Sequence, residues 1–94
     1  MRFLRKYVTL ADGTEAEIDI LGKGVRNGEE VTIIGEAKSL LEGGDVDRFL
    51  EVLKGLTGVI SGRVLKIFVT HMARPSVEKY AQANDIQVIY TYEL

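Results

Sequence analysis

Three ionisable residues, Asp19, Glu36 and Lys38, lie within two strand-like runs of the sequence, E-A-E-I-D-I-L and E-V-T-I-I-G-E-A-K. Side chains alternate between the two faces of a strand, so Glu36 and Lys38 project to the same side. If the two runs form neighbouring strands, two carboxylates and one ammonium converge on one patch at a rim of the sheet. Carboxylate oxygens bind Mg²⁺, and a nearby lysine can orient or deprotonate an attacking water. These residue types therefore indicate metal-dependent hydrolysis.

The alternative interpretation of this patch is an ordinary cross-strand ion pair on a sheet surface. Such a pair contributes roughly 0.2–1 kcal/mol to stability. Ionisable groups inside apolar strands are costly unless they are paired or put to use, which favours the metal site. Strict alternation along the first run predicts two faces, one with Glu15, Glu17, Asp19 and Leu21 and the other with Ala16, Ile18 and Ile20.

The first half of the chain predicts an antiparallel meander of three strands. Strand-like runs cover residues 2–10, 15–21 and 30–38, and the stretch 22–28 between the last two is expected to be a loop. Asp12-Gly13 and Asn27-Gly28 supply turn signals between the runs, because glycine accepts a positive φ without steric cost.

The second half predicts two helices that alternate with two further strands. Asp45 is a candidate N-cap, and apolar residues then recur at helical spacing from Val46 to Leu56. The run 64–69 is nearly continuous in apolar residues, as expected of a buried strand. Pro75 fits the first turn of a second helix that continues to Asn84, and 86–92 is a final strand. The expected core residues are Phe49, Leu53, Val64, Ile67, Phe68 and Tyr80.

These elements together predict an α/β fold: a mixed β-sheet with the order βββ-α-β-α-β, flanked by helices. Ninety-four residues without a linker or an internal repeat predict one domain over residues 1–94. His71, the single histidine, falls at the end of the predicted fourth strand without the serine or cysteine partners of a catalytic triad, so we interpret it as a strand-end polar residue.

Composition narrows the class of protein. Fourteen acidic and twelve basic side chains give a net charge of −2, which counts against a non-specific binder of nucleic acid. The absence of cysteine excludes a disulfide scaffold and a thiolate metal site, and with few Asn and Gln it favours a thermophilic source. No apolar run approaches the roughly 20 residues that span a bilayer, and no signal peptide is recognisable, so we expect a cytoplasmic protein without a membrane partner.

At Asp19 in E-I-D-I-L and Glu36-Ala37-Lys38 in I-I-G-E-A-K-S, the chain resembles the PD-(D/E)XK nuclease-like superfamily. This superfamily includes many restriction endonucleases and archaeal Holliday-junction resolvases. The likeness covers residue 6 to the C-terminus and includes the strand–strand–helix–strand order. It implies a restriction-endonuclease-like core, DNA as the substrate, and Mg²⁺ as the cofactor with Mn²⁺ as a substitute. It also implies that Asp19 and Glu36 bind the metal and that Lys38 assists the attacking water, which makes these three the catalytic residues.

One feature of the superfamily is not matched by the sequence. Its members usually begin with a helix that carries another glutamate of the metal site, whereas this chain starts in a predicted strand. The chain is then either a fragment of a longer protein or a reduced domain. Glu15 and Glu17 are candidates to replace that glutamate, but we interpret both as solvated strand residues. The rival function is a catalytically inactive module of the nuclease fold for nucleic-acid binding or protein assembly. The uncovered sheet face and the edge strands also predict a homodimer.

Overall fold

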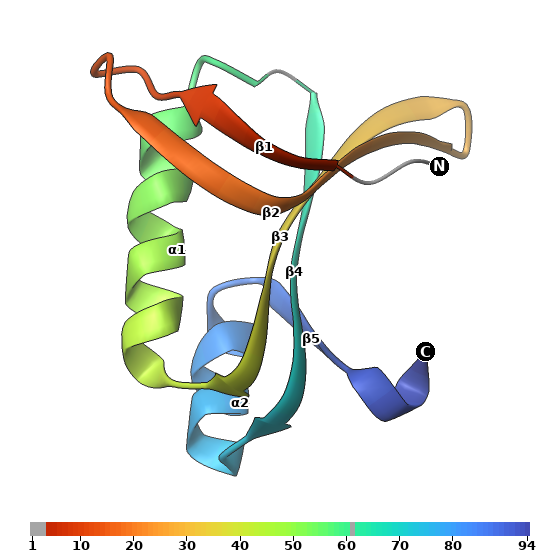
Figure 1. Ribbon diagram of the computed structural model, residues 1–94. Helices are drawn as coiled ribbons and strands as arrows, with labels where there is room; N and C mark the ends of the chain where they lie inside the picture. The colour runs from red at the N-terminus through yellow and green to blue at the C-terminus, as the bar shows by residue number, and fades with distance from the viewer. Residues whose placement is uncertain (1–3, 61) are drawn as a thin grey trace.

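The structure, a computed structural model, describes residues 4–60 and 62–94. A five-stranded sheet has the spatial order β1-β2-β3-β4-β5 and is accompanied by helices α1 and α2 (Figure 1). The first three strands pair antiparallel, whereas β3–β4 and β4–β5 pair parallel. The predicted mixed α/β architecture is confirmed. The elements in chain order are β1 Leu4–Thr9, β2 Glu15–Arg26, β3 Glu29–Leu41, α1 Gly43–Leu56, β4 Arg63–Ala73, α2 Pro75–Ala83, β5 Ile86–Tyr90 and the 3₁₀ helix η1 Thr91–Glu93.

The two hairpins form at the predicted turn residues. Asp12 Oδ1 accepts a hydrogen bond from the Thr14 amide at 2.9 Å, which closes the turn between β1 and β2. Asn27 and Gly28 have φ values of 52° and 77°, as a tight hairpin turn of this handedness requires. The predicted loop at 22–28 is wrong, because β2 continues pairing with β3 as far as Arg26 opposite Glu29.

The later strands and helices deviate from the predicted limits by a few residues. β4 extends beyond 64–69 to Arg63–Ala73, while the last strand ends at Tyr90 because the chain turns into η1. α2 begins at Pro75 as predicted, with the ring in the first turn, where its missing N–H leaves no bond unmade. Each of α1 and α2 connects two parallel strands, which is the usual route for such a crossover.

The start of α1 differs from the expectation that Asp45 is its N-cap. The helix begins at Gly43 after the N-cap residue Glu42, and Asp45 lies three positions into it. The Asp45 carboxylate reaches back and accepts a hydrogen bond from the Glu42 amide at 2.9 Å through Oδ2. Asp45 therefore still stabilises the helix terminus, as the third residue of a capping box rather than as the cap itself.

The main hydrophobic core lies between the sheet and both helices. The rings of Phe49 from α1 and Phe68 from β4 pack with their centroids 4.9 Å apart. Of the six expected core residues, Phe49, Ile67 and Phe68 are buried and Leu53 and Val64 are half-buried. Tyr80 contradicts the prediction: it is 40% exposed, and its hydroxyl donates to Asp47 across the gap between α2 and α1.

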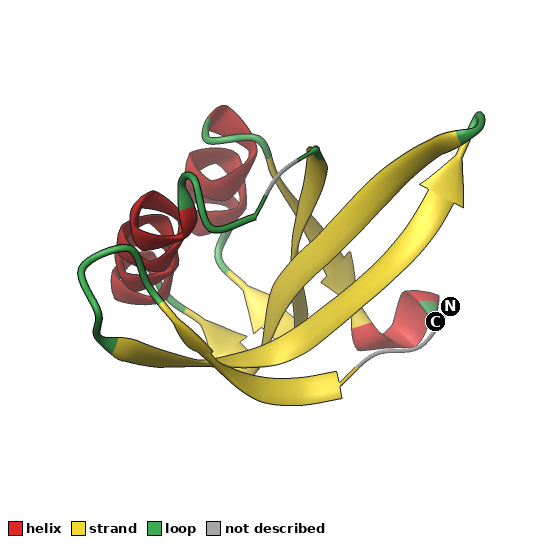
Figure 2. Cartoon of the chain, turned by 90° about the horizontal axis from the view of Figure 1, so that it is seen from above, coloured by secondary structure: helices red, strands yellow, loops and turns green. Residues whose placement is uncertain are grey.

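A second apolar cluster lies on the sheet face opposite α1 and α2, which both pack against the same face (Figure 2). It consists of buried Val31, Ile33 and Ile67 with partly buried Ile20, Leu65, Val69 and Ile89. Within residues 4–60 and 62–94, neither the length nor the hydropathy of any helix suffices to cross a membrane.

Candidate functional site

A β-bulge at Asp19 is the first feature that shapes the candidate site. In the β1–β2 ladder Lys6 pairs with Ile18 and Leu4 pairs with Leu21, so Arg5 on β1 lies opposite two residues, Asp19 and Ile20, on β2. Such a bulge interrupts the alternation of side chains and re-aims the residues that follow. The predicted faces of this strand are therefore wrong: Ile18 and Leu21 pack into the core under the helices, whereas Ile20 belongs to the cluster on the opposite face.

The pairing between β2 and β3 also ends next to Asp19, at the pair Ile20 and Gly35. Beyond this pair the Ala37 amide of β3 donates to the Asp19 side chain, with 3.1 Å from nitrogen to Oδ2. The Asp19 carboxylate thus takes the place of a strand carbonyl as hydrogen-bond acceptor. This interaction fixes Asp19 beside Glu36, the residue that precedes Ala37.

The carboxyl groups of Asp19 and Glu36 lie side by side and shift each other's pKa in opposite directions. Burial, the Asp19 charge and hydrogen bonding to Asp19 raise the pKa of Glu36 to about 7, although the Lys38 charge opposes the increase. Burial also acts to raise the pKa of Asp19. The hydrogen bonds from Ala37 and Glu36 and the Arg5 guanidinium outweigh it, so that pKa lies below its ordinary value. Below about pH 7 Glu36 therefore carries the proton that the pair shares.

Lys38 lies two residues after Glu36 on β3, and both side chains line a cavity of about 190 Å³. Its Nζ is 3.7 Å from Oδ1 of Asp45 in the first turn of α1. The structure thus places all three predicted site residues together: Asp19 and Glu36 in direct contact, and Lys38 beside Glu36 with its ammonium directed to Asp45.

The two glutamates considered as substitutes for a missing acidic residue lie at the margin of the site. Glu17 lines the cavity that holds Glu36, and its charge contributes to the raised pKa of Glu36. Its Oε1 is 3.8 Å from Nε of Arg5. Glu15 is exposed at the start of β2. Within the described part of the chain, no three His, Cys, Asp or Glu residues are grouped closely enough to enclose a metal ion by themselves.

Three charged residues near the site were missed by the sequence interpretation. Arg5 contacts Asp19, with 3.2 Å between Nη2 and Oδ1, and Asp45 contacts both Lys38 and Arg48. The i,i+3 spacing of Asp45 and Arg48 on a predicted helix is a signal that could have linked these two residues. Arg5 offered no comparable signal, because its position depends on the bulge in β2.

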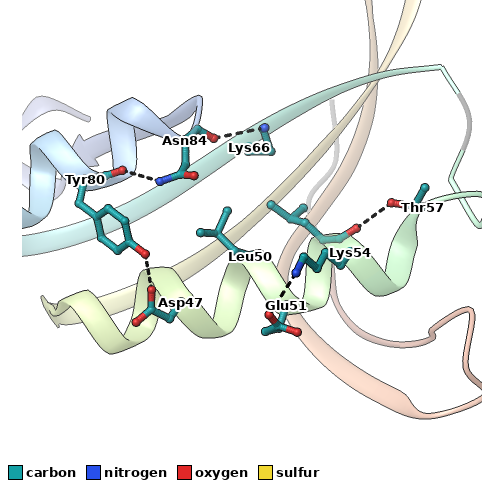
Figure 3. A pocket seen from close by; sticks show the side chains of 9 residues that line it. Asp47, Leu50, Glu51, Lys54, Thr57, Lys66, Tyr80 and Asn84 are labelled. Atoms are coloured by element: carbon teal, nitrogen blue, oxygen red, sulfur yellow. Dashed lines mark hydrogen bonds and ion pairs between the residues drawn. The ribbon is translucent and has the colours of Figure 1, made fainter.

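A larger groove of about 610 Å³ lies away from these residues, between α1 and α2 (Figure 3). Its polar side chains are engaged with neighbours: Tyr80 with Asp47, Lys54 with Glu51, and Lys66 with the Asn84 carbonyl. The groove is therefore a packing crevice between helices. His71, which was expected at a strand end, lies within β4, since the strand continues to Ala73, and its Nδ1 is 2.6 Å from the Thr91 hydroxyl.

Comparison with solved structures gives a likeness in fold. The chain superposes on the crystal structure of a repair endonuclease from Pyrococcus abyssi with a TM-score of 0.62 and 17% sequence identity. The match covers 96% of this chain but only 38% of the length of that protein. No protein-family model matches the sequence, and a search of curated proteins finds no match. The chain thus shares its fold with part of a repair endonuclease.

Proposed function

We propose that the protein is a Mg²⁺-dependent nuclease of the PD-(D/E)XK type that hydrolyses phosphodiesters in DNA. The observation that carries this proposal is the contact of Asp19 with Glu36 at the point where the β2–β3 ladder opens, with Lys38 beside it. The fold shared with a repair endonuclease supports DNA as the substrate class. Perturbed carboxyl groups at a break in a sheet are more typical of a functional site than of a surface ion pair.

The donor set fits Mg²⁺. This ion keeps several of its waters and binds proteins through one or two carboxylates together with substrate phosphates, so it does not need a cage of three acidic residues. Asp19 and Glu36 are held side by side with their pKa values shifted in opposite directions, and a bound divalent cation would favour the ionised form of both. When bound, Mg²⁺ or Mn²⁺ would stabilise the charge that develops on the phosphate and acidify a bound water.

The residues of the chain supply binding and orientation. Asp19 is fixed by the Ala37 amide, and Glu36 binds the ion once it has lost its proton. Lys38 positions the attacking water. The oxygen of that water bonds to phosphorus and gives up one proton to solvent while one phosphorus–oxygen ester bond breaks, and the departing DNA oxygen takes up one proton from solvent.

A cleavage assay tests this function directly. Linear, branched and single-stranded DNA would be incubated with the purified protein and Mg²⁺ or Mn²⁺. We expect cleavage that is lost in Glu36→Ala and in Lys38→Ala. Glu30→Ala is a matched control, because this exposed carboxylate pairs with Lys23 near the tip of the β2–β3 hairpin. Cleavage that survives both site substitutions would come from a contaminating nuclease and would contradict the proposal.

Calorimetric titration with Mn²⁺ separates the enzyme from the rival function. The nuclease should bind Mn²⁺ at a site that Glu36→Ala removes. An inactive module of the same fold would bind no Mn²⁺ up to millimolar concentration.

A further inference from the structure

The Asp45 carboxylate joins two cations, Lys38 from β3 and Arg48 from α1. Its Oδ1 is 3.7 Å from Lys38 Nζ and is also in contact with Arg48 Nη2. Its Oδ2 accepts the hydrogen bond from the Glu42 amide. The Asp45 side chain is only 10% exposed, whereas those of Lys38 and Arg48 are 39% and 70% exposed. A nearly buried carboxylate thus anchors two cations that solvent reaches.

The same three residues line the cavity that contains Glu36. Its apolar wall comes from α1, through Phe49 and Val52. A change in the position of the Lys38 ammonium is therefore a change inside the cavity that Glu36 also lines.

Both cations keep hydrogen-bond donors that Asp45 does not use. An ammonium has three N–H donors and a guanidinium has five in a planar fork, and one carboxylate oxygen cannot occupy them all. The Arg48 guanidinium lies over the first turn of α1, with Nη1 3.8 Å from where a Cβ on Gly44 would stand. The unused face of such a fork matches the oxygens of a phosphate.

Resting on the nuclease function proposed above, we propose that Asp45 positions Lys38 for the hydrolytic step and that Arg48 binds a phosphate of the DNA. Asp45 then acts through Lys38 and is a positioning residue. Arg48 touches the substrate and sets the affinity for it.

The plain alternative is that Asp45 serves only the start of α1. Asp45→Asn separates the two roles, because the amide oxygen can still accept from the Glu42 N–H while the charge that holds Lys38 and Arg48 is gone. Glu51→Gln is the matched control on the same helix, since it removes a carboxylate that lies 3.7 Å from Lys54 and is 75% exposed.

Single-turnover cleavage of DNA in Mg²⁺, measured over a series of protein concentrations, gives a maximal rate and a half-saturating concentration for each variant. We expect Asp45→Asn to lower the maximal rate about tenfold or more, since small displacements of a positioning group have effects of that size. We expect Arg48→Gln to raise the half-saturating concentration and to reduce its log–log salt dependence by about one unit, which is the loss of one phosphate contact. Glu51→Gln should change neither quantity.

The outcomes distinguish the two proposals. If the wild-type protein cleaves and Asp45→Asn keeps its maximal rate, the positioning role of Asp45 is overturned while the nuclease function stands. An unchanged salt dependence in Arg48→Gln overturns the phosphate contact in the same way. Failure of the wild-type protein to cleave overturns the nuclease function, and this inference falls with it. Circular dichroism checks folding, and Asp45→Gln, a residue that suits the third position of a capping box, replaces Asp45→Asn if the latter does not fold.

Discussion

Glu36 is partly buried next to another carboxylate, and this position links its charge to the stability of the fold. The pKa of Glu36 is about 7 in the folded chain, against an ordinary value of 4.5. Between these two pH values the folded state binds more protons than the unfolded state, so the free energy of unfolding falls as pH rises through this window. The stabilisation that the protonated Glu36 side chain gives the folded state is fully present below about pH 4.5 and is lost above pH 7.

Glu36→Gln removes this dependence on pH. We expect the variant to be more stable than the wild-type protein at pH 8 by about 1 kcal/mol, which is less than the full conversion of the shift because Glu36 is partly exposed to solvent. Urea unfolding at pH 4.5, 6 and 8 measures the effect. Asp12→Asn is the control with the opposite sign, since the hydrogen bonds from Thr14 hold the pKa of Asp12 below its ordinary value and so stabilise the fold at pH values above that ordinary value. A Glu36→Gln variant that is less stable at pH 8 would contradict the prediction.

Arg5 acts as a counter-ion to the candidate metal site. Its Nη2 is 3.2 Å from Oδ1 of Asp19. The other carboxylate oxygen of Asp19, Oδ2, accepts the hydrogen bond from the Ala37 amide. A metal ion that binds Asp19 through Oδ1 must displace the guanidinium. We expect Arg5→Ala to bind Mn²⁺ more tightly by up to about fivefold, because an ion pair whose cation is open to solvent is worth only about 0.2–1 kcal/mol.

Calorimetry on Arg5→Ala and on the control Lys23→Ala measures this competition. Lys23 also pairs with a glutamate across neighbouring strands, 3.6 Å from Glu30 Oε1, but far from Asp19 along β2. Weaker Mn²⁺ binding in Arg5→Ala alone would mean that Arg5 supports the metal site instead of competing for it.

At the scale of single elements, the sequence pattern predicts the strands and helices well and their irregularities poorly. Apolar spacing is sufficient to place Phe49 and Phe68 in the core, and the E-x-K spacing puts Glu36 and Lys38 on one side of β3. It does not reveal the bulge that moves Ile20 to the opposite face. A bulge adds one unpaired residue within a strand whose overall register the turn and the apolar pattern set, and the apolar residues of β2 do not show where that extra residue falls.

The parts of the site that were not predicted depend on contacts between elements. Asp45 and Arg48 join the site because α1 begins at Gly43 and passes over β3, which no single strand or helix pattern specifies. Similarly, Tyr80 has the spacing of an inward-facing helix residue but lies at the margin of α2, where its hydroxyl reaches Asp47 and solvent.

Gly35 on β3 marks a close approach of two strands next to the site. A Cβ at this position would lie 2.6 Å from Ile67 Cγ1 and 2.7 Å from the Ile67 carbonyl oxygen. The carbonyl belongs to a buried parallel ladder and cannot move aside without breaking it. We expect Gly35→Ala to lower the free energy of unfolding by about 1–3 kcal/mol, the usual cost of overpacking.

Chemical denaturation of Gly35→Ala and Gly43→Ala tests this packing argument. Gly43 is the control because a Cβ there meets no atom within 4 Å. As the first residue of α1, it should tolerate alanine or gain slightly from its higher helix propensity. Equal stability of the two variants would contradict the close approach of β3 and β4.

At the scale of the whole molecule, the sheet is covered unequally. α1 and α2 lie on one face (Figure 2). The second apolar cluster, centred on Val31, Ile33 and Ile67, lies on the other face. β1 and β5 form the outer edges of the sheet, where unpaired backbone groups can recruit another strand. Apolar sheet surface and open edges together favour association between chains.

We therefore predict that the chain forms a homodimer that buries the sheet face opposite α1 and α2. Two-fold pairing is the commonest way to cover such a surface, and it would place two candidate metal sites on one particle, which suits cleavage of both strands of a duplex. Ile89→Gln, on the outer strand β5 and within the second cluster, should shift the equilibrium to monomers. Val25→Gln, at a side chain that is 76% exposed near the β2–β3 turn, should leave it unchanged. Sedimentation equilibrium at micromolar concentration decides the question: the mass of a single chain for the wild-type protein would refute the dimer, and equal masses for the two variants would place its interface elsewhere.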